Sequence, residues 1–281
     1  MRIRHAAPGD ESALREFLAG LSERSRYMRF FQGQARLDDN AAALANCESH
    51  DGVGLVAVDD SDAVVAHAHL FRTGTGLHEM GIAVADTHQR RGLGARLLGA
   101  LGREAGQRGI RSYRAVVLSS NQPMLRLLSS IGCVIADSDT DFFDLVVGTE
   151  GTMPAWPAEP GGRPRVLVEG QGWYSSAESA AVASLGCDTL RCTGRLPSHS
   201  CPLLDGGSCP LVDGADLVVV AFGPGDPNRA VLAAHRSRPG SPPVVAVSRG
   251  GAAPAGSVPG PRTDAGAFAD AVGRALGSAA P

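Results

Sequence analysis

The sequence predicts an α/β protein of two domains: an α+β domain with a mixed central sheet, then a smaller parallel α/β domain of flavodoxin or Rossmann type. Three observations support this prediction. A glycine-containing loop joins an apolar strand to a long amphipathic segment in the first half of the chain. A stretch rich in Pro and Gly interrupts the pattern after residue 148. Beyond it, apolar runs alternate with helical segments, which is typical of a parallel sheet.

Composition indicates a globular protein. The 281 residues allow two domains, and contents of 43% hydrophobic and 20% charged residues are ordinary for folded proteins. The net charge of −3 comes with no polybasic run, so we expect neither nucleic acid nor an anionic membrane as a partner. No apolar run approaches the ~20 residues that cross a bilayer, and residues 1–5 lack a signal-peptide pattern. A cytoplasmic location is therefore expected.

The first domain, residues 1–148, is predicted to begin with a strand and a helix. Asp10 is expected to cap this helix, whose apolar residues Leu14, Phe17 and Leu18 are spaced for one buried face. A hairpin and a third antiparallel strand follow, then a long helix, a further strand and a closing hairpin. The strands that we expect are residues 2–5, 53–58, 63–70, 77–85, 112–118, 133–136 and 142–147.

The loop Gln89–Ala95 leads from the third antiparallel strand into the long helix. A helix start exposes unpaired N–H groups at the positive end of the helix dipole, which favours binding of a phosphate or pyrophosphate. Gly92 and Gly94 allow a ligand to approach the backbone, and Arg90 and Arg91 add positive charge. The sequence therefore predicts a site for a phosphorylated cofactor.

Two motifs in this half of the chain resemble the GNAT superfamily of acetyl-CoA-dependent N-acyltransferases. The acyl-CoA signature of that family, Q/R-x-x-G-x-G/A, matches residues 89–94, and the family also has an Asn after the next strand, as Asn121 is here. Its short last helix ends in Gly-Phe, where this sequence has Gly132 and Cys133. The resemblance covers roughly the first 148 residues and is closest to the bacterial protein-lysine acetyltransferases.

The resemblance implies transfer of an acetyl or other acyl group from acetyl-CoA to an amine. Glu79, on the cofactor strand, is the implied general base, with His78, His67 and His69 in reserve; an exposed glutamate without a catalytic role is the alternative. The strand backbone would hold the pantetheine arm, and the N–H of Val84 would face the oxyanion. The implied cofactor-binding residues are Ile82, Ala83, Val84, Gln89, Arg90, Arg91, Gly92, Leu93, Gly94, Ala95 and Asn121.

The segment Leu21–Phe31 is rich in Arg and aromatic residues and resembles the acceptor side of the protein-lysine acetyltransferases. We therefore expect a protein lysine ahead of a small-molecule amine as acceptor. The alternative is that Tyr27, Phe30 and Phe31 belong to the core. Many family members have a Tyr acid on the last short helix, where Leu128 stands here. This departure leaves a non-catalytic acyl-CoA sensor as the alternative function.

The second half is predicted to hold a Pro- and Gly-rich linker over residues 149–164 and a regulatory or ligand-sensing domain over residues 165–281. Receiver-type phosphotransfer is excluded, because the chain has no Lys and a central strand ends in Ala221 rather than in Asp. A glycine loop, Gly170–Gly172, offers a weak nucleotide-binding motif. The elements that we expect are strands at residues 165–169, 215–221 and 244–247, and helices at residues 177–185, 228–235 and 264–276.

Four of the six cysteines lie in this half of the chain. Their spacing matches neither a zinc ribbon nor a redox C-x-x-C motif, so no metal ligand is assigned. Buried thiols without a function, a metal or iron–sulfur site, and a redox-sensitive disulfide all remain open. The residues concerned are Cys187, Cys192, Cys201 and Cys209.

Overall fold

The computed structural model describes residues 1–31, 37–74, 77–149, 152–156, 162–170, 175–194, 201–221, 223, 225–226, 229–248 and 255–277. The chain divides into two units by its internal contacts. The first comprises Met1–Leu127 and Thr140–Thr152, and the second comprises Leu128–Asp139 and Met153–Pro281. The predicted boundaries at residues 148 and 165 remain predictions, because a short segment before residue 140 is grouped with the second unit.

The first unit has a mixed sheet, as the sequence predicts. In its described residues the strand order is β1-β2-β3-β4-β5-β7. The strands from β1 to β4 form an antiparallel meander, β5 runs parallel to β4, and β7 runs antiparallel to β5. The strands are β1 (Arg2–His5), β2 (Val53–Val58), β3 (Val64–Arg72), β4 (His78–Val84), β5 (Ser112–Leu118) and β7 (Phe142–Gly148).

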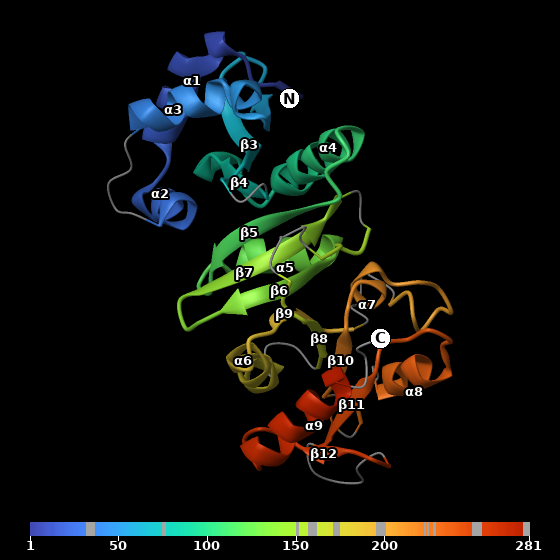
Figure 1. Ribbon diagram of the computed structural model, residues 1–281. Coiled ribbons are helices and arrows are strands. Elements are labelled where there is room, and N and C mark those ends of the chain that lie inside the picture. Colours follow the sequence, from blue (N-terminus) through green and yellow to red (C-terminus); the bar gives the residue numbers. More distant parts are fainter. Residues whose placement is uncertain are drawn as a thin grey trace. The chain divides into compact units, whose positions relative to one another are not determined.

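Helices cover both faces of this sheet, and Figure 1 shows α1, α2 and α3 on one side of β3 and β4 and α4 on the other. The side chains of β4 alternate accordingly: Ala83 packs against the cluster of α1 and α3, whereas Val84 lies on the side of α4, beside Gly94. The sequence did not predict α3. The helices are α1 (Glu11–Gly20), α2 (Glu23–Phe30), α3 (Leu37–Ala45) and α4 (Leu93–Gln107); α5 (Gln122–Ile131) begins in this unit and continues into the second at Leu128.

Asp10 precedes α1, but its carboxylate does not cap the helix. Its two oxygens accept hydrogen bonds from the guanidinium of Arg4, both at 2.7 Å, and Oδ2 also accepts one from the N–H of Ala7 at 2.8 Å. The hydrogen bond from Arg4 holds the pKa of Asp10 below its ordinary value, against the opposing effect of burial. The predicted cap is wrong because a charge-assisted pair with β1 competes with it.

The second unit contains a series of parallel strands with one antiparallel strand beside them. Among its described strands the order is β6-β9-β8-β10-β11-β12, with β6 antiparallel to β9 and the other neighbours parallel. Numbered along the chain, the parallel strands follow the order 2-1-3-4-5. The sequence did not predict β9 or β12. The strands are β6 (Cys133–Ser138), β8 (Arg165–Glu169), β9 (Asp188–Cys192), β10 (Leu217–Val220), β11 (Val244–Ser248) and β12 (Val258–Pro259).

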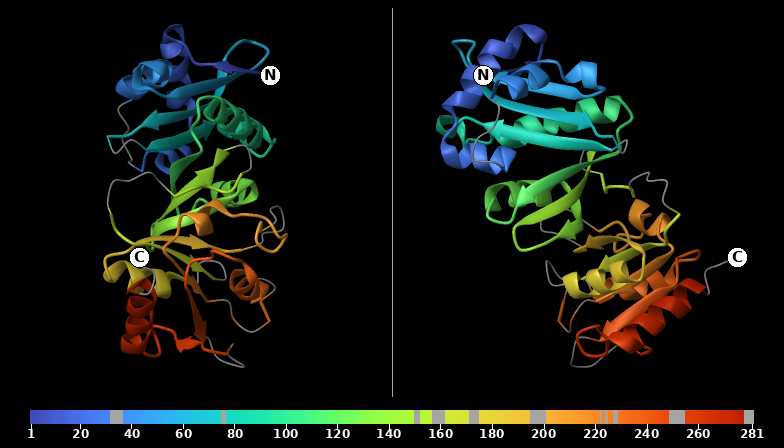
Figure 2. Two further views of the ribbon diagram at one scale, coloured as in Figure 1. Left: turned by 45° about the vertical axis from the view of Figure 1, so that its right-hand side comes forward. Right: turned by 60° about the vertical axis from the view of Figure 1, so that its left-hand side comes forward.

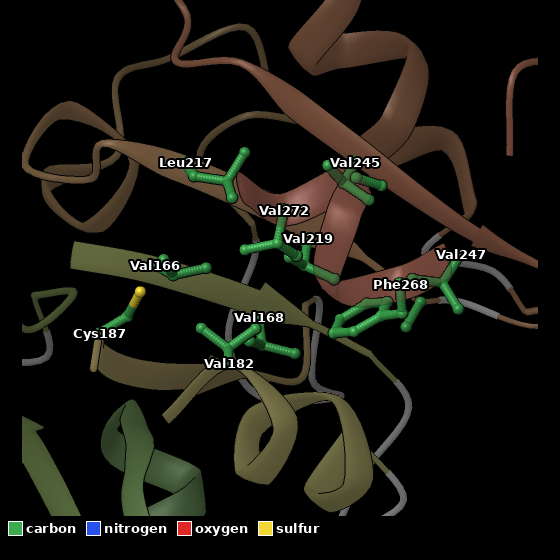
Figure 3. Close-up of a cluster of buried hydrophobic side chains, with 12 residues drawn as sticks. Val166, Val168, Val182, Cys187, Leu217, Val219, Val245, Val247, Phe268 and Val272 are labelled. Carbon is green, nitrogen blue, oxygen red and sulfur yellow. The ribbon is translucent and has the colours of Figure 1, made fainter. Parts of the chain in front are cut away.

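One face of this parallel sheet forms an apolar core with α6 and α9, which lie side by side (Figure 2). Figure 3 shows Val166 and Val168 of β8 and Val219 of β10 in the same cluster as Phe268 of α9. Alternation along β8 places Glu169 on the opposite face, where α8 packs. The helices of this unit are α6 (Ser176–Ser184), α7 (Pro210–Asp213), α8 (Ala230–Ser237) and α9 (Ala265–Gly277).

Some predicted features lie partly outside the described residues. They are the linker, the glycine loop Gly170–Gly172, of which Gln171 and Gly172 are not described, and the start of the helix expected from Asn228. Within the described residues, no helix is both long and apolar enough to cross a membrane.

Candidate active site

The parallel strands β4 and β5 diverge toward their carboxyl ends. Over two fully described strands they share a single pair of Cα partners, Glu79 and Arg114. On its other side β4 pairs with β3 along its whole length, from His78 to Val84. The β4 backbone beyond Glu79 therefore has no strand partner on the side of β5, although it lies inside the sheet. Such a gap can accept an extended ligand arm that bonds like an additional strand.

The loop after β4 has an unusual backbone conformation that the sequence anticipates in part. Gly92 has a φ of 76° and is the N-cap of α4. Arg90 also lies in the left-handed region, with a φ of 59°, which is uncommon for a residue with a side chain. No side chain caps α4, and its first turn contains no acidic residue. The first N–H groups of α4 are therefore open to an anion.

The two glycines of the loop have different roles. Gly92 has open space where a Cβ would stand, so its positive φ is the reason for a glycine there. A Cβ on Gly94 would lie 3.7 Å from Leu127 Cδ2 and 3.9 Å from Val84 Cγ2, which is ordinary contact. Only Gly92 is therefore required by the backbone.

Gln89 links the loop to α2, a connection that sequence reasoning missed. Its Nε2 donates to Ser25 Oγ at 3.1 Å and to the carbonyl of Val84 at 3.0 Å. The predicted contact of Gln89 with a pyrophosphate stays a prediction, since its side-chain donor is engaged by these two oxygens. Arg90 and Arg91 are exposed and lie beside the start of α4.

Asp86 strengthens this link. Its carboxylate accepts hydrogen bonds from the N–H of Ser22 at 2.9 Å, from Ser22 Oγ at 2.8 Å and from Ser25 Oγ at 2.7 Å. Burial pulls the pKa of Asp86 upward, but these hydrogen bonds hold it below its ordinary value. The start of α2 is thus tied to the loop by an ionised carboxylate. The bonds span 61 to 64 residues of sequence, which is why no local pattern indicated them.

Glu79 is exposed on β4, opposite Phe71 of β3 and Arg114 of β5. The guanidinium of Arg114 is bound by Asp144, which is buried in β7: Nε donates to Oδ1 at 3.2 Å, and Nη2 donates to Oδ2. Arg114 is therefore neutralised by its own partner. The carboxylate of Glu79 remains accessible, as a general base must be.

His67 and His69 share one face of β3, as the sequence predicts, with ring centroids 5.4 Å apart. Burial, with a smaller effect of the Arg29 charge, lowers the pKa of His67 to about 3 and that of His69 well below its ordinary value. Both rings are therefore neutral at physiological pH. Buried and without access to water, they are poor candidates for a base that must exchange protons.

Arg29 of α2 reaches the same face of the sheet. Its Nη2 lies 3.5 Å from Nε2 of His69 and over the backbone of Gly81. The aromatic residues beside it are less buried than a core role requires: Tyr27 is 46% exposed and Phe31 is 40% exposed. The interpretation of these two as core residues is wrong, whereas Phe30 packs partly against the α1 and α3 cluster.

Asn121 occupies the position just before α5. Its Oδ1 accepts a hydrogen bond from the N–H of Met124 at 3.3 Å, so its side chain caps this helix. The predicted contact of Asn121 with a cofactor stays a prediction. Leu128, at the position where many related enzymes have a Tyr, is completely buried. It presents no acidic group to a reaction.

The comparison with protein families decides the identity of this half of the chain. Residues 19–132 match the model of the Acetyltransferase (GNAT) family. This segment is a GNAT acetyltransferase domain. The family uses acetyl-CoA as acyl donor and acts on an amine, so the expectation of an acetyl-CoA-dependent N-acetyltransferase is confirmed.

Solved structures similar to the chain include one GNAT domain and two proteins described as acetyltransferases. The GNAT domain of S. lividans PAT is 26% identical, with a TM-score of 0.48; the match covers 52% of this chain and 89% of that one. A putative acetyltransferase from Salmonella typhimurium, solved with acetyl-CoA, is 20% identical, with a TM-score of 0.44 and coverages of 53% and 93%. The ribosomal-protein-alanine N-acetyltransferase from Brucella melitensis is 20% identical, with a TM-score of 0.43 and coverages of 53% and 99%.

Three cysteines of the second unit, Cys192, Cys201 and Cys209, lie near a buried polar pair outside the GNAT domain. Nε2 of His235 lies 2.8 Å from Oε2 of Glu169, both groups being almost completely buried. Burial raises the pKa of the thiols of Cys192, Cys201 and Cys209, and the carboxylate of Glu169 adds to this effect. All are free and buried, and no group of three or more potential ligands in the described residues is arranged to hold a metal ion.

Proposed function

We propose that the GNAT domain binds acetyl-CoA along β4 and its following loop and that Glu79 is the general base for the acceptor amine. The divergence of β4 and β5 immediately beyond Glu79 carries this proposal. An accessible carboxylate, an unpaired strand edge and a helix start without a side-chain cap follow one another along β4 and the loop after it. A general base at the end of this gap would lie where the attacking amine must lose a proton.

The donor would be held mainly by backbone groups. The strand edge from Ile82 to Val84 would bond the amides of the pantetheine arm, and the first N–H groups of α4, at Leu93, Gly94 and Ala95, would bind the pyrophosphate. Arg90 and Arg91 would add charge at the exposed side of the loop. When bound, acetyl-CoA supplies the acetyl group as a thioester.

Glu79 would accept a proton from the acceptor. An aliphatic amine has an ordinary pKa of about 10.4, so at neutral pH it is almost entirely protonated and cannot attack until it loses a proton. The N–H of Val84 would donate to the oxyanion that forms at the thioester carbon. Because Leu128 has no proton to give, CoA would leave as the thiolate.

Two finer points belong to the same proposal. The first is the acceptor, for which a protein lysine ranks ahead of a small-molecule amine because Tyr27 and Phe31 are exposed beside Arg29. The second unit is a flavodoxin-like regulatory domain, supported by its strand order 2-1-3-4-5.

Thiol release from acetyl-CoA in the presence of amine acceptors tests the proposal. Replacing Glu79 by Gln should lower kcat by roughly 10²- to 10⁴-fold, the usual contribution of a general base, without weakening acetyl-CoA binding. Glu16→Gln, at an exposed glutamate of α1, is the matched control and should leave kcat unchanged. All 26 basic residues of the chain are Arg, so the enzyme offers no lysine side chain of its own as acceptor.

Tight acetyl-CoA binding without thiol release on any peptide or small amine would contradict the proposal. It would favour the acyl-CoA sensor. That function is worth testing because Leu128, which is apolar, occupies the position where many family members have a Tyr as general acid. Loss of acetyl-CoA binding in Glu79→Gln would show that Glu79 supports the strand rather than the reaction.

A further inference from the structure

Arg29 differs from two other part-buried arginines of the GNAT domain, Arg4 and Arg114, in the way its charge is balanced. Arg4 is paired with Asp10 at 2.7 Å, and Arg114 is paired with Asp144. Arg29 is half-buried, and among the described residues no carboxylate lies within 4.0 Å of its guanidinium. Burial lowers its pKa to about 10, against the opposing effect of the Glu79 charge. Arg29 is therefore still a cation at neutral pH, and it is partly removed from water.

The partner that Arg29 does have is not a counter-ion. Nη2 lies 3.5 Å from Nε2 of His69, whose ring is neutral because burial lowers its pKa. A neutral ring can accept one N–H from the guanidinium but returns no charge. A guanidinium carries five N–H donors in a planar fork that matches a carboxylate. The part of Arg29 that remains accessible is thus suited to an anion.

Gly81 makes this position possible. A Cβ on Gly81 would stand 2.5 Å from Nη2 of Arg29 and 2.5 Å from Cε1 of His69, closer than any real contact allows. The strand therefore has a glycine where the guanidinium and the imidazole rest against the backbone. The arrangement is built by three elements, α2, β3 and β4, rather than by one flexible side chain on the surface.

The site lies next to the proposed base. Gly81 follows Glu79 by two positions, so alternation places the two residues on the same face of β4, about 7 Å apart from Cα to Cα. An acceptor that presents its amine to Glu79 can therefore present a second group to Arg29 at the same time.

We infer that Arg29 binds a carboxylate of the acceptor, so that the acceptor is an amine carrying an anionic group several bonds from the reacting nitrogen. This inference rests on the proposed function and gives it a substrate class. The carboxylate has two possible sources. It belongs either to an acidic residue beside a lysine in a peptide or to the terminal carboxylate of a free amino acid.

Matched acceptor pairs test the inference with the full-length protein. One pair is a peptide with a single Lys flanked by Glu residues and the same peptide with Gln in their place. The other is Nα-acetyl-lysine and its carboxamide, in which only the ε-amine can react. We expect a kcat/KM about 10- to 100-fold higher for the acidic member of at least one pair, expressed mainly in KM, because a charge-assisted pair is gained. Which pair shows the preference identifies the source.

Arg29→Met should bring the ratio within that pair close to 1, and Arg29→Lys should keep part of it. Arg26→Met, on the same helix, is the control and should leave the ratio unchanged, since the Arg26 guanidinium bonds the carbonyl of Ala19 instead. Turnover with no preference in either pair of the wild type would overturn the inference, as would an equal loss on both members in Arg29→Met. Complete absence of turnover on all four acceptors would instead reject the proposed function.

Discussion

The carboxyl ends of parallel strands are the usual ligand sites of α/β sheets. In this protein the polar residues at these strand ends are exposed in the first unit and buried in the second. In the first unit β4 and β5 separate, the loop that follows is exposed, and Glu79 is open to solvent. In the second unit the end of β8 carries Glu169, which is 4% exposed and bound to His235. Both sheet edges therefore carry a glutamate, but of these two only Glu79 is accessible to a ligand.

The chemistry of the two edges follows from this difference. Thiols surrounded by apolar groups and a buried carboxylate stay protonated, and protonated thiols are poor nucleophiles and poor metal ligands. A buried pair such as Glu169 with His235 holds its elements in place without contacting a reactant. The comparison supports the proposed reaction site in the first unit, whereas Glu169 and His235 at the second edge are buried and bound to each other.

The largest effect is expected from breaking the buried pair. His235→Ala leaves the carboxylate of Glu169 buried without a partner, which typically costs about 3–5 kcal/mol. Both tryptophans of the chain, Trp156 and Trp173, belong to the second unit, so urea unfolding followed by tryptophan fluorescence reports on that unit alone. We expect its unfolding free energy to fall by this amount while acetyl-CoA still binds to the GNAT domain.

A double variant separates the cost of an orphaned charge from the value of the pair. Glu169→Leu with His235→Leu removes both polar groups and should destabilise the second unit far less than His235→Ala alone. If His235→Ala unfolds at the wild-type urea concentration, the pair does not hold this edge together. The second edge would then have no stabilising polar pair to set against the accessible Glu79 of the first.

A smaller effect, confined to the first unit, is expected on acidification. The pKa of His67 is about 3 in the folded protein and 6.5 in an unfolded chain, so between these values the unfolded state binds more protons. Its contribution to stability is complete above pH 6.5 and is lost as the pH falls toward 3, by up to about 1.4 kcal/mol per pH unit. At pH 5 the unfolding free energy should be about 2 kcal/mol lower from this residue.

Hydrogen exchange resolved by mass spectrometry can follow the two units separately, with rates corrected for the intrinsic effect of pH. Peptides from β3 should lose protection from pH 7.5 to pH 5, and His67→Leu should make this dependence shallower. Protection in β3 that does not change with pH would show that the ring is already charged or solvated in the folded protein.

The sequence predicted those parts of the fold that depend on neighbours along the chain. β5 begins and ends where expected, at Ser112 and Leu118, and the expected long helix follows the glycine loop, because apolar periodicity and glycine placement are local signals. The second unit shows the limit of this approach: β9, whose residues Asp188–Cys192 alternate only weakly, went unpredicted although it lies inside the sheet. The glycine loop was a strong structural signal because its turn and the start of α4 are adjacent in the sequence.

Long-range side-chain contacts, in the candidate site and in the second unit, could not be predicted, because they join residues that are distant in sequence. Arg29 and His69 are 40 residues apart, and Glu169 and His235 are 66 residues apart. Gly81 looked like any glycine of a strand until the structure placed a guanidinium against it. Local propensity also misled at Asp10, a good capping residue whose carboxylate is taken by Arg4.

The smallest effects are expected from substitutions of the two loop glycines, Gly92 and Gly94, which test how the loop binds acetyl-CoA. Gly92→Ala forces a side chain into a φ of 76°, which costs about 1 kcal/mol, and it disturbs the first N–H groups of α4. Both thermal stability and acetyl-CoA affinity should fall, the affinity several-fold by calorimetry. Gly94→Ala should do neither, because the added methyl group meets Leu127 and Val84 at ordinary contact distance and Ala favours the helix. A large loss of affinity in Gly94→Ala with stability intact would mean that the donor approaches the backbone at that residue. The loop would then bind through its second glycine as well as through the turn that Gly92 makes.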